Sequence, residues 1–152
     1  MSDAATRALA EHFNARLRDV VLLLRRVNAD QPVTSQQLAV LGSLDGGPRR
    51  MTELAEEQGV RLPTMTAQIN RLERDGLVRR GRDAADARVV TVELTGAGAE
   101  HLRTGRARRV DFLADRLAAL SPDDREAIAA ALPALDRLFA PERKTPYART
   151  TT

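Results

Sequence analysis

The spacing of apolar residues along the chain predicts a mainly helical fold. From residue 5 to residue 28 apolar side chains recur every three or four positions, between Leu9 and Val27, which places them along one stripe of a long helix. Thr34, followed three residues later by Gln37, has the pattern of a capping box. We therefore expect a second helix to begin at this point.

A pair of short helices joined by a tight turn is expected next. Thr52 begins the first helix, and Gly59 ends it because glycine readily adopts a positive φ angle. The second helix covers residues 63–74, and Asp75 with Gly76 closes it. The apolar residues on the inward side of this second helix are Met65, Ile69 and Leu72.

The segments that follow predict a β-hairpin with a charged tip. Residues 77–80 and 89–94 are rich in β-branched side chains, and residues 81–88 between them are polar and charged. Helix, turn, helix and hairpin in this order form a winged helix-turn-helix. In that arrangement the second helix enters the major groove of DNA, and the hairpin contacts the backbone or the minor groove.

Two more helices are expected after the hairpin. Thr95 caps the first of them. Ser121 and Pro122 begin the last one, since serine is favoured at the cap and proline at the first helical position. This last helix extends towards Phe139, and Pro133 predicts a kink or a break within it.

Length and composition indicate one folded domain. With 152 residues the chain has the size of a single domain, which we place at residues 1–140. We divide it into a winged helix at residues 34–95 and flanking helices at residues 5–29 and 96–140. Residues 141–152 are polar and are expected to be disordered.

The amino-acid composition limits the classes of function that the chain can have. Only 3% of the residues are aromatic, so the core is expected to be aliphatic. The isoelectric point of about 10.4 is typical of nucleic-acid-binding proteins, although the arginine preference of a GC-rich genome is an equally good explanation of this value. The absence of cysteine excludes disulfides, thiolate zinc sites and thiol-based redox sensing.

The outward side of the helix at residues 63–74 favours DNA binding. It carries hydrogen-bond donors and no carboxylate, whereas an ordinary surface helix mixes acidic and basic side chains. Glu73 falls near the edge of the buried side, where it opposes a phosphate least. We expect this face to lie in the major groove, and its members are Pro63, Thr66, Ala67, Asn70, Arg71 and Arg74.

The hairpin adds basic side chains to this surface. Arginine fits a narrow minor groove and pairs with phosphates, which favours a wing that contacts DNA. Asp83 and Asp86 lie among the arginines, so neutralisation within the hairpin is an equally good explanation. The arginines are Arg79, Arg80, Arg82 and Arg88.

The chain carries a series of short motifs in a fixed order. They are Met51-Thr52-Glu53-Leu54-Ala55, Gly59-Val60, Pro63-Thr64-Met65-Thr66, Arg71-Leu72-Glu73, Asp75-Gly76-Leu77-Val78, Asp86-Ala87-Arg88 and Leu94-Thr95 with Ala97-Gly98. In this order the motifs resemble the MarR family of transcription regulators, and the resemblance covers residues 34–98. It implies a triangular homodimer that binds a pseudo-palindromic operator in double-stranded DNA, and a repressor that is relieved by a small amphipathic or phenolic effector.

The same resemblance implies which residues contact DNA. The second short helix would contact bases, and Arg88, held by Asp86, would occupy the minor groove. Relatives often have serine at the position of Arg61 and arginine at the position of Ala67. The base preference of the relatives therefore cannot be transferred to this chain. The expected DNA-binding residues are Arg61, Pro63, Thr64, Thr66, Ala67, Gln68, Asn70, Arg71 and Arg74 in the helix and Arg80, Arg82, Asp86 and Arg88 in the wing.

Three side chains of the helix suit particular bases. Gln68 and Asn70 are candidates for adenine, because an amide pairs with its N6 and N7 atoms. Arg71 is a candidate for guanine or for a phosphate.

The amphipathic helices at the two ends of the chain predict a dimer independently. They present more aliphatic surface than a winged helix covers, although a bundle within one monomer is an alternative. The resemblance also implies an effector pocket lined by the first, second and fifth helices, with His12, Arg16 and Leu41 as candidates. The expected dimerisation residues are Leu9, Phe13, Leu17, Leu113, Leu117, Leu132, Leu135 and Phe139.

Other functions have little support in the sequence. His12 and His101 lack metal-ligand spacing, and neither a phosphate-binding glycine loop nor a cysteine nucleophile is present, so we expect no enzyme, no metal and no cofactor. A winged-helix protein-interaction module and a non-specific architectural DNA binder are the alternative functions. No membrane partner is expected, because no signal segment or apolar span is recognisable, and the expected location is the cytoplasm.

Overall fold

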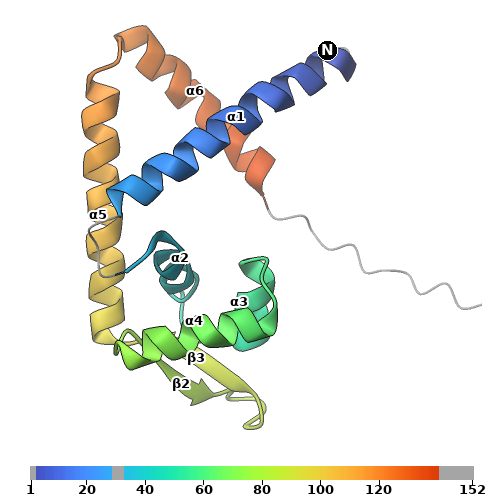
Figure 1. Ribbon diagram of the computed structural model, residues 1–152, viewed down its shortest axis with the longest axis vertical. Helices are drawn as coiled ribbons and strands as arrows, with labels where there is room; N and C mark the ends of the chain where they lie inside the picture. The colour runs from blue at the N-terminus through green and yellow to red at the C-terminus, as the bar shows by residue number, and fades with distance from the viewer. Residues whose placement is uncertain (1–2, 29–32, 141–152) are drawn as a thin grey trace, which may run out of the picture. The chain divides into compact units, whose positions relative to one another are not determined.

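The computed structural model describes residues 3–28 and 33–140 (Figure 1). These residues form helices and a small antiparallel sheet, which confirms the expected fold class. The predicted disordered tail at residues 141–152 lies outside the described residues. The elements are α1 (Asp3–Val27), α2 (Ser35–Ser43), β1 (Arg49–Arg50), α3 (Met51–Glu57), α4 (Leu62–Arg74), β2 (Val78–Arg82), β3 (Val90–Leu94), α5 (Gly96–Ala118) and α6 (Pro122–Phe139).

Local hydrogen bonds explain where the short helices begin and end. The Gln37 N–H donates to Thr34 Oγ1 at 3.2 Å and the Thr34 N–H donates to Gln37 Oε1 at 2.9 Å, so the predicted capping box of α2 is present. The ends of α3 and α4 lie at Gly59 and Gly76, whose φ angles are 63° and 73°. At both ends the next amide donates to a carbonyl five residues back, which satisfies an otherwise orphaned acceptor.

The core lies among α2, α3, α4 and the hairpin. The three predicted inward residues of α4 are completely buried, and each such side chain contributes roughly 1.5–3 kcal/mol to folding. Figure 1 shows α4 running along the hairpin, and this packing holds both DNA-binding candidates in one rigid unit. The core residues are Val33, Leu38, Val40, Leu41, Leu44, Leu54, Ala55, Met65, Ile69, Leu72, Leu77, Val78, Val92 and Leu102.

The sheet contains a strand that the sequence did not predict. The strand order is β1-β3-β2, with antiparallel pairing. In β1, Arg49 is opposite Val92 and Arg50 is opposite Thr91. Two residues are too few for an alternating pattern to be recognised. The strand matters for the site because it connects the start of α3 to the hairpin.

The chain divides into two compact units, residues 1–112 and residues 113–152. In the first unit, glycines allow α5 to approach its neighbours closely. A Cβ atom on Gly98 would lie 1.9 Å from the carbonyl oxygen of Leu77, and one on Gly105 would lie 2.9 Å from Cδ2 of Leu38. Only glycine fits at Gly98 without a shift of the backbone.

The second unit contains α6. Its first turn is as predicted, because the Asp124 N–H donates to Ser121 Oγ at 3.1 Å and Pro122 lies directly after the cap. The predicted break at Pro133 is wrong, since α6 continues through this proline to Phe139. The alanines around the proline favour helix strongly, and this preference offsets the lost backbone hydrogen bond.

Candidate nucleic-acid interface

The outer side of α4 presents the polar surface that the periodicity predicts. Asn70, Arg71 and Arg74 are exposed on it, together with Pro63, Thr64 and Ala67. Thr66 and Gln68 are half-buried. The Thr66 hydroxyl donates to the Leu62 carbonyl at 2.9 Å, which leaves its oxygen as an acceptor.

Gln68 and Arg61 lie at the border of this surface. Gln68 Oε1 is buried and has no hydrogen-bond partner among the described residues, so Gln68 is less well placed for a base edge than Asn70. Arg61 is the N-cap residue of α4, but its side chain makes no capping hydrogen bond. Because it is exposed at a helix N-terminus, where backbone N–H groups attract anions, Arg61 is positioned for a phosphate.

The one acidic side chain of α4 is neutralised. Glu73 Oε2 accepts a hydrogen bond from Arg80 Nη1 at 2.5 Å. The same guanidinium donates through Nη2 to Asn70 Oδ1 at 2.6 Å. The sequence analysis did not identify this contact between the wing and α4.

The strand pattern of the hairpin explains how its arginines are distributed. Side chains alternate between the faces of a strand, so Arg80 and the buried Val78 lie on the face towards α4. Arg79 lies on the opposite face, where its Nε donates at 2.7 Å to Oε1 of Glu93, its cross-strand neighbour. Arg82 Nη1 donates to the Ala87 carbonyl at 3.1 Å, within the hairpin loop.

The two aspartates of the hairpin have structural partners. Asp83 Oδ2 accepts from Arg50 Nε at 2.7 Å, and its Oδ1 accepts from the N–H groups of Ala85 and Asp86. Asp86 Oδ1 accepts from the backbone N–H of Arg88 at 3.0 Å. The Asp83 carboxylate is thus held by Arg50 of β1, which favours the DNA-contacting wing over neutralisation within the hairpin.

The contacts of Arg50 shift the pKa values of the groups around it. The hydrogen bond from Arg50, followed by the bonds from the Ala85 and Asp86 amides, lowers the pKa of Asp83 below its ordinary value. The same contact raises the pKa of Arg50. The pKa of Glu53 is lowered, mainly by the backbone N–H of Arg50 and then by the Arg49 side chain. Arg50 therefore connects the start of α3 to the hairpin loop.

The contact between Arg50 and Asp83 predicts a pH-dependent stability. Folding lowers the pKa of the Asp83 carboxylate, so its contacts stabilise the fold at any pH above the pKa of aspartate in the unfolded chain, which is about 3.9. This stabilisation is lost as the pH falls through the lower pKa that Asp83 has in the folded protein. We expect Asp83→Asn to lower the free energy of unfolding at pH 7. The difference from wild type should shrink below about pH 4, as measured by urea unfolding. A difference that does not change with pH would contradict this assignment.

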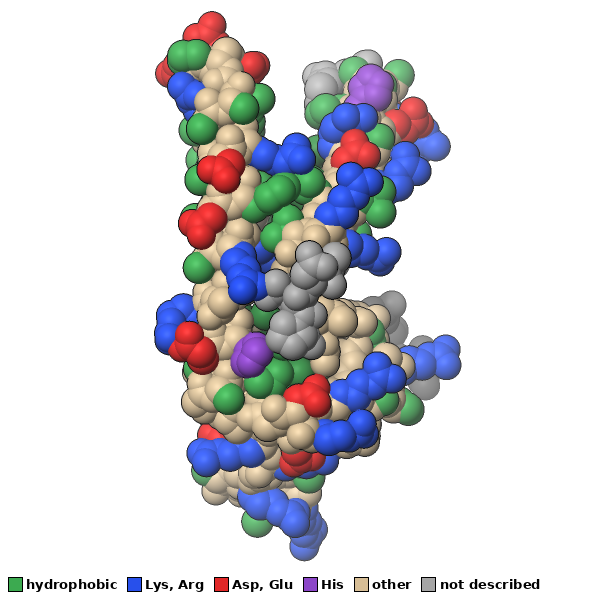
Figure 2. Space-filling view, turned by 60° about the vertical axis from the view of Figure 1, so that its left-hand side comes forward, with side chains coloured by type: hydrophobic (Ala, Val, Ile, Leu, Met, Phe, Trp, Pro, Cys, Tyr) green, Lys and Arg blue, Asp and Glu red, His purple; other side chains and the backbone are tan. Residues whose placement is uncertain are grey.

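Basic side chains gather around the hairpin. In Figure 2, arginine side chains project from the lowest part of the view, at the height of the hairpin in Figure 1. The hairpin residues Arg80, Arg82 and Arg88 are exposed. Two exposed arginines near the end of α4 extend this basic surface, and they are Arg71 and Arg74.

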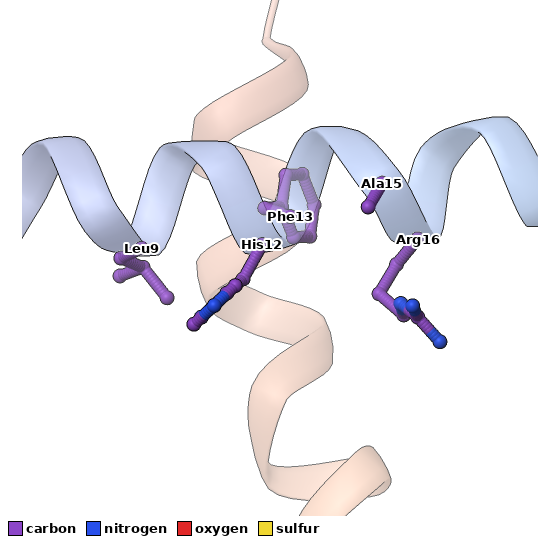
Figure 3. Close-up of a pocket in the computed structure, with 5 residues that line it drawn as sticks. All are labelled: Leu9, His12, Phe13, Ala15 and Arg16. Atoms are coloured by element: carbon purple, nitrogen blue, oxygen red, sulfur yellow. The ribbon is translucent and has the colours of Figure 1, made fainter.

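The residues predicted for an effector pocket are not brought together. His12 and Arg16 lie on the same side of α1, in a shallow hollow of about 420 Å³ that Leu9, Phe13 and Ala15 also line (Figure 3). Leu41 is completely buried in the core and lines no described pocket.

A second pocket lies between α2 and α5 in the first unit. It measures about 170 Å³, and its walls combine aliphatic and basic side chains. Arg109 Nε is buried and lacks a hydrogen-bond partner among the described residues, whereas Arg106 is paired with Asp45 at 2.5 Å. The lining residues are Leu38, Ala39, Gly42, Leu102, Gly105, Arg106 and Arg109.

The part of the chain that the structure describes holds neither a metal-binding cluster nor a membrane-spanning helix. Within residues 3–28 and 33–140, no group of His, Cys, Asp and Glu side chains is arranged to hold a metal ion. None of the helices formed by these residues is long and apolar enough to cross a membrane.

Comparison with known proteins relates the chain to transcription regulators. The model of the MarR family matches residues 31–89, which include α2, β1, α3, α4, β2 and the hairpin loop and end just before β3. An HTH-type transcriptional regulator of Mycobacterium bovis is 36% identical over 109 residues, which cover 71% of this chain and 76% of the relative.

Solved structures share the fold. A MarR family protein from Bacillus stearothermophilus superposes with a TM-score of 0.78 at 24% identity, over 91% of this chain and 97% of that one. A mutant of the Staphylococcus aureus protein MepR, solved bound to an oligodeoxyribonucleotide, has a TM-score of 0.60 at 21% identity, over 86% of this chain and 96% of that one.

Proposed function

Because the chain belongs to the MarR family of DNA-binding transcriptional regulators, we propose that it represses transcription by binding a pseudo-palindromic operator as a homodimer. The family and the relatives are regulators and not enzymes, as the sequence indicates. Such a regulator acts at the chromosome, so the proposed location is the cytoplasm. In this account α4 enters the major groove and the wing contacts the backbone and the minor groove.

One observation carries this proposal. The exposed side of α4 combines donors with arginines, and two nearby carboxylates are paired, Glu73 with Arg80 and Asp83 with Arg50. A surface of this kind attracts phosphates without opposing them. A MepR mutant of the same fold was solved bound to an oligodeoxyribonucleotide, which supports DNA as the ligand. A protein-interaction module has no need of arginines on both the helix and the wing.

Apolar surface on the outer helices supports a dimer. No residue of α1 or α6 is buried, although both helices carry large aliphatic side chains. Leu9 is 57% exposed and Leu132 is 52% exposed. Stripes of this length need a partner in water, and a second copy with twofold symmetry provides one. Among the predicted dimerisation residues, Leu17, Leu113, Leu117 and Phe139 are also exposed, whereas Phe13 and Leu135 are half-buried.

The pocket between α2 and α5 is our candidate for the effector. An engineered cavity of about 150 Å³ holds benzene, so a pocket of 170 Å³ accepts a single aromatic ring. Arg109 then offers a buried donor to an anionic or phenolic group. Benzoate is a suitable probe, and we expect it to raise the melting temperature of the wild type but not of Arg109→Met. An equal response of both proteins would exclude this pocket.

Selection of bound sites from random double-stranded DNA tests the proposed function. Purified protein should enrich a motif with twofold symmetry and half-sites about one helical turn apart. It should bind that motif at least about a thousandfold more tightly than unrelated duplexes. Uniform affinity across sequences would indicate an architectural protein, and a motif without symmetry would contradict the dimer.

The wing assignment predicts the behaviour of Arg88→Ala. Loss of one phosphate or minor-groove contact should weaken binding to all duplexes alike and reduce the slope of log K against log salt by about one. Fluorescence anisotropy at several salt concentrations measures both quantities. Identical slopes for the variant and the wild type would remove Arg88 from the interface.

A further inference from the structure

Arg80 connects the wing to two side chains of α4. Its Nη1 donates to Glu73 Oε2 at 2.5 Å, and its Nη2 donates to Asn70 Oδ1 at 2.6 Å. Asn70 and Glu73 are three residues apart, so they lie side by side on the helix. Arg80 reaches them because it shares a strand face with Val78, which is buried against α4. One guanidinium therefore fixes both side chains.

The chemistry of this contact determines what Asn70 offers to DNA. A guanidinium carries only donors, so Arg80 binds the amide oxygen of Asn70 and never its nitrogen. The exposed amide group then presents two N–H donors from Nδ2. We propose that Arg80 is a positioning residue for base preference. Its guanidinium occupies one lone pair of the Asn70 amide oxygen, and its positive charge opposes a second donor there, so Asn70 acts mainly as a hydrogen-bond donor in the major groove. The proposal rests on the proposed function, since it requires α4 to lie in the major groove.

An asparagine that acts mainly as a donor favours guanine over adenine. The bidentate contact with adenine requires the amide oxygen to accept from N6 while the amide nitrogen donates to N7. Because Arg80 occupies one lone pair of this oxygen and places a positive charge beside it, the remaining lone pair is a weakened acceptor for the N6 amino group of adenine. Guanine presents two acceptors, O6 and N7, which suit the free amide N–H groups. This proposal differs from our expectation from the sequence alone, in which Asn70 was a candidate for adenine.

The contact is strong enough to influence the choice of base. It is charge-assisted, and such hydrogen bonds are roughly twice as strong as neutral ones. Glu73 holds the guanidinium from the other side, and the Arg80 and Glu73 side chains are only 34% and 37% exposed. The amide oxygen of Asn70 therefore has a competing partner in place before the helix meets a base.

The test compares base preference in matched variants. The Asn70-dependent base pair is first located as the position at which Asn70→Ala loses its selectivity in selection from random duplexes. Dissociation constants are then measured by fluorescence anisotropy for duplexes that differ only by guanine or adenine at that position. The wild type should prefer guanine by roughly tenfold, and Arg80→Met should reduce or reverse that ratio. In Arg80→Met the Glu73 charge loses its partner and weakens binding to both duplexes alike, so this general loss cancels in the ratio of the two dissociation constants.

Two further variants separate this effect from a loss of charge or of fold. Arg79→Met removes an arginine and an ion pair, with Glu93, from the opposite face of the same strand, so it should weaken all duplexes and preserve the ratio. Asn70→Asp retains a partner for Arg80 but has no donor, so it should lose the preference for guanine. Thermal unfolding of each variant establishes that it is folded.

The outcomes distinguish this inference from the proposed function. A wild-type preference for adenine at this position, an unchanged ratio in Arg80→Met, or no position affected by Asn70→Ala would each overturn the role of Arg80. A symmetric operator would still support the proposed function in those cases. A wild type that discriminates between no sequences would contradict the proposed function itself.

Discussion

Gly98→Ala should destabilise the protein by about 3 kcal/mol, the upper end of the usual cost of overpacking. The new Cβ would lie 1.9 Å from the carbonyl oxygen of Leu77, and backbone atoms cannot rotate away as a side chain does. The same carbonyl accepts a hydrogen bond from the Thr95 N–H at 3.1 Å, so any shift also disturbs the junction between the hairpin and α5. Thermal unfolding should show a decrease in melting temperature of roughly 10 °C.

A neighbouring glycine provides the control. Gly96 also belongs to the first turn of α5, but no atom lies within 4 Å of a Cβ built there. Because alanine forms helices better than glycine, Gly96→Ala should leave the stability unchanged or raise it slightly. Equal melting temperatures for the two variants would show that α5 does not approach Leu77 as closely as described.

Arg71→Ala should weaken operator binding by about 2 kcal/mol, which corresponds to roughly thirtyfold. Arg71 is exposed in the last turn of α4, and a bidentate contact with guanine or a phosphate is lost with it. The free energy of unfolding of the Arg71→Ala variant should remain close to that of the wild type, because substitutions at the surface usually change stability little. Titration of the selected operator by fluorescence anisotropy measures the change.

Arg103→Ala is the matched control for this substitution. Arg103 is an exposed arginine on α5 that is paired with Glu100, and its removal changes the net charge by the same amount. Binding to the operator should fall far less than for Arg71→Ala. Similar losses in the two variants would mean that overall charge, rather than the surface of α4, governs affinity.

The sequence was sufficient to predict which side of α4 is buried and which is exposed. A period of 3.6 residues identified the buried side of α4 from Met65, Ile69 and Leu72, and the opposite side follows from geometry alone. Caps and glycines marked the helix ends because these signals are local. The order of the motifs then indicated the family.

Contacts between distant residues could not be predicted in the same way. Arg50 and Asp83 are 33 positions apart, and nothing local indicates that β1 brings them together. The contact between Arg80 and Asn70 was partly accessible, since alternation from Val78 directs Arg80 towards the helix. The choice of Asn70 rather than another residue of α4 depends on how the helix packs on the strand.

The sequence also could not predict how deeply side chains are buried at the border between the buried and exposed faces of a helix. Gln68 was assigned to a base contact, whereas half of its side chain faces the protein and its Oε1 atom is buried. Leu41 was assigned to an effector pocket and is instead completely buried in the core. Helical periodicity gives directions to within about one position, which does not separate the rim of a face from its centre.

Site-specific photo-crosslinking tests the central claim most directly, namely that the outer side of α4 lies against duplex DNA. Ala67 is exposed on this side, and a photoreactive amino acid there removes no donor from the surface. Ala107, exposed on α5, is the reference position. We expect the protein labelled at Ala67 to crosslink to the selected operator and the protein labelled at Ala107 not to do so. Crosslinks from Ala67 to a second protein chain, with none to DNA, would contradict the account.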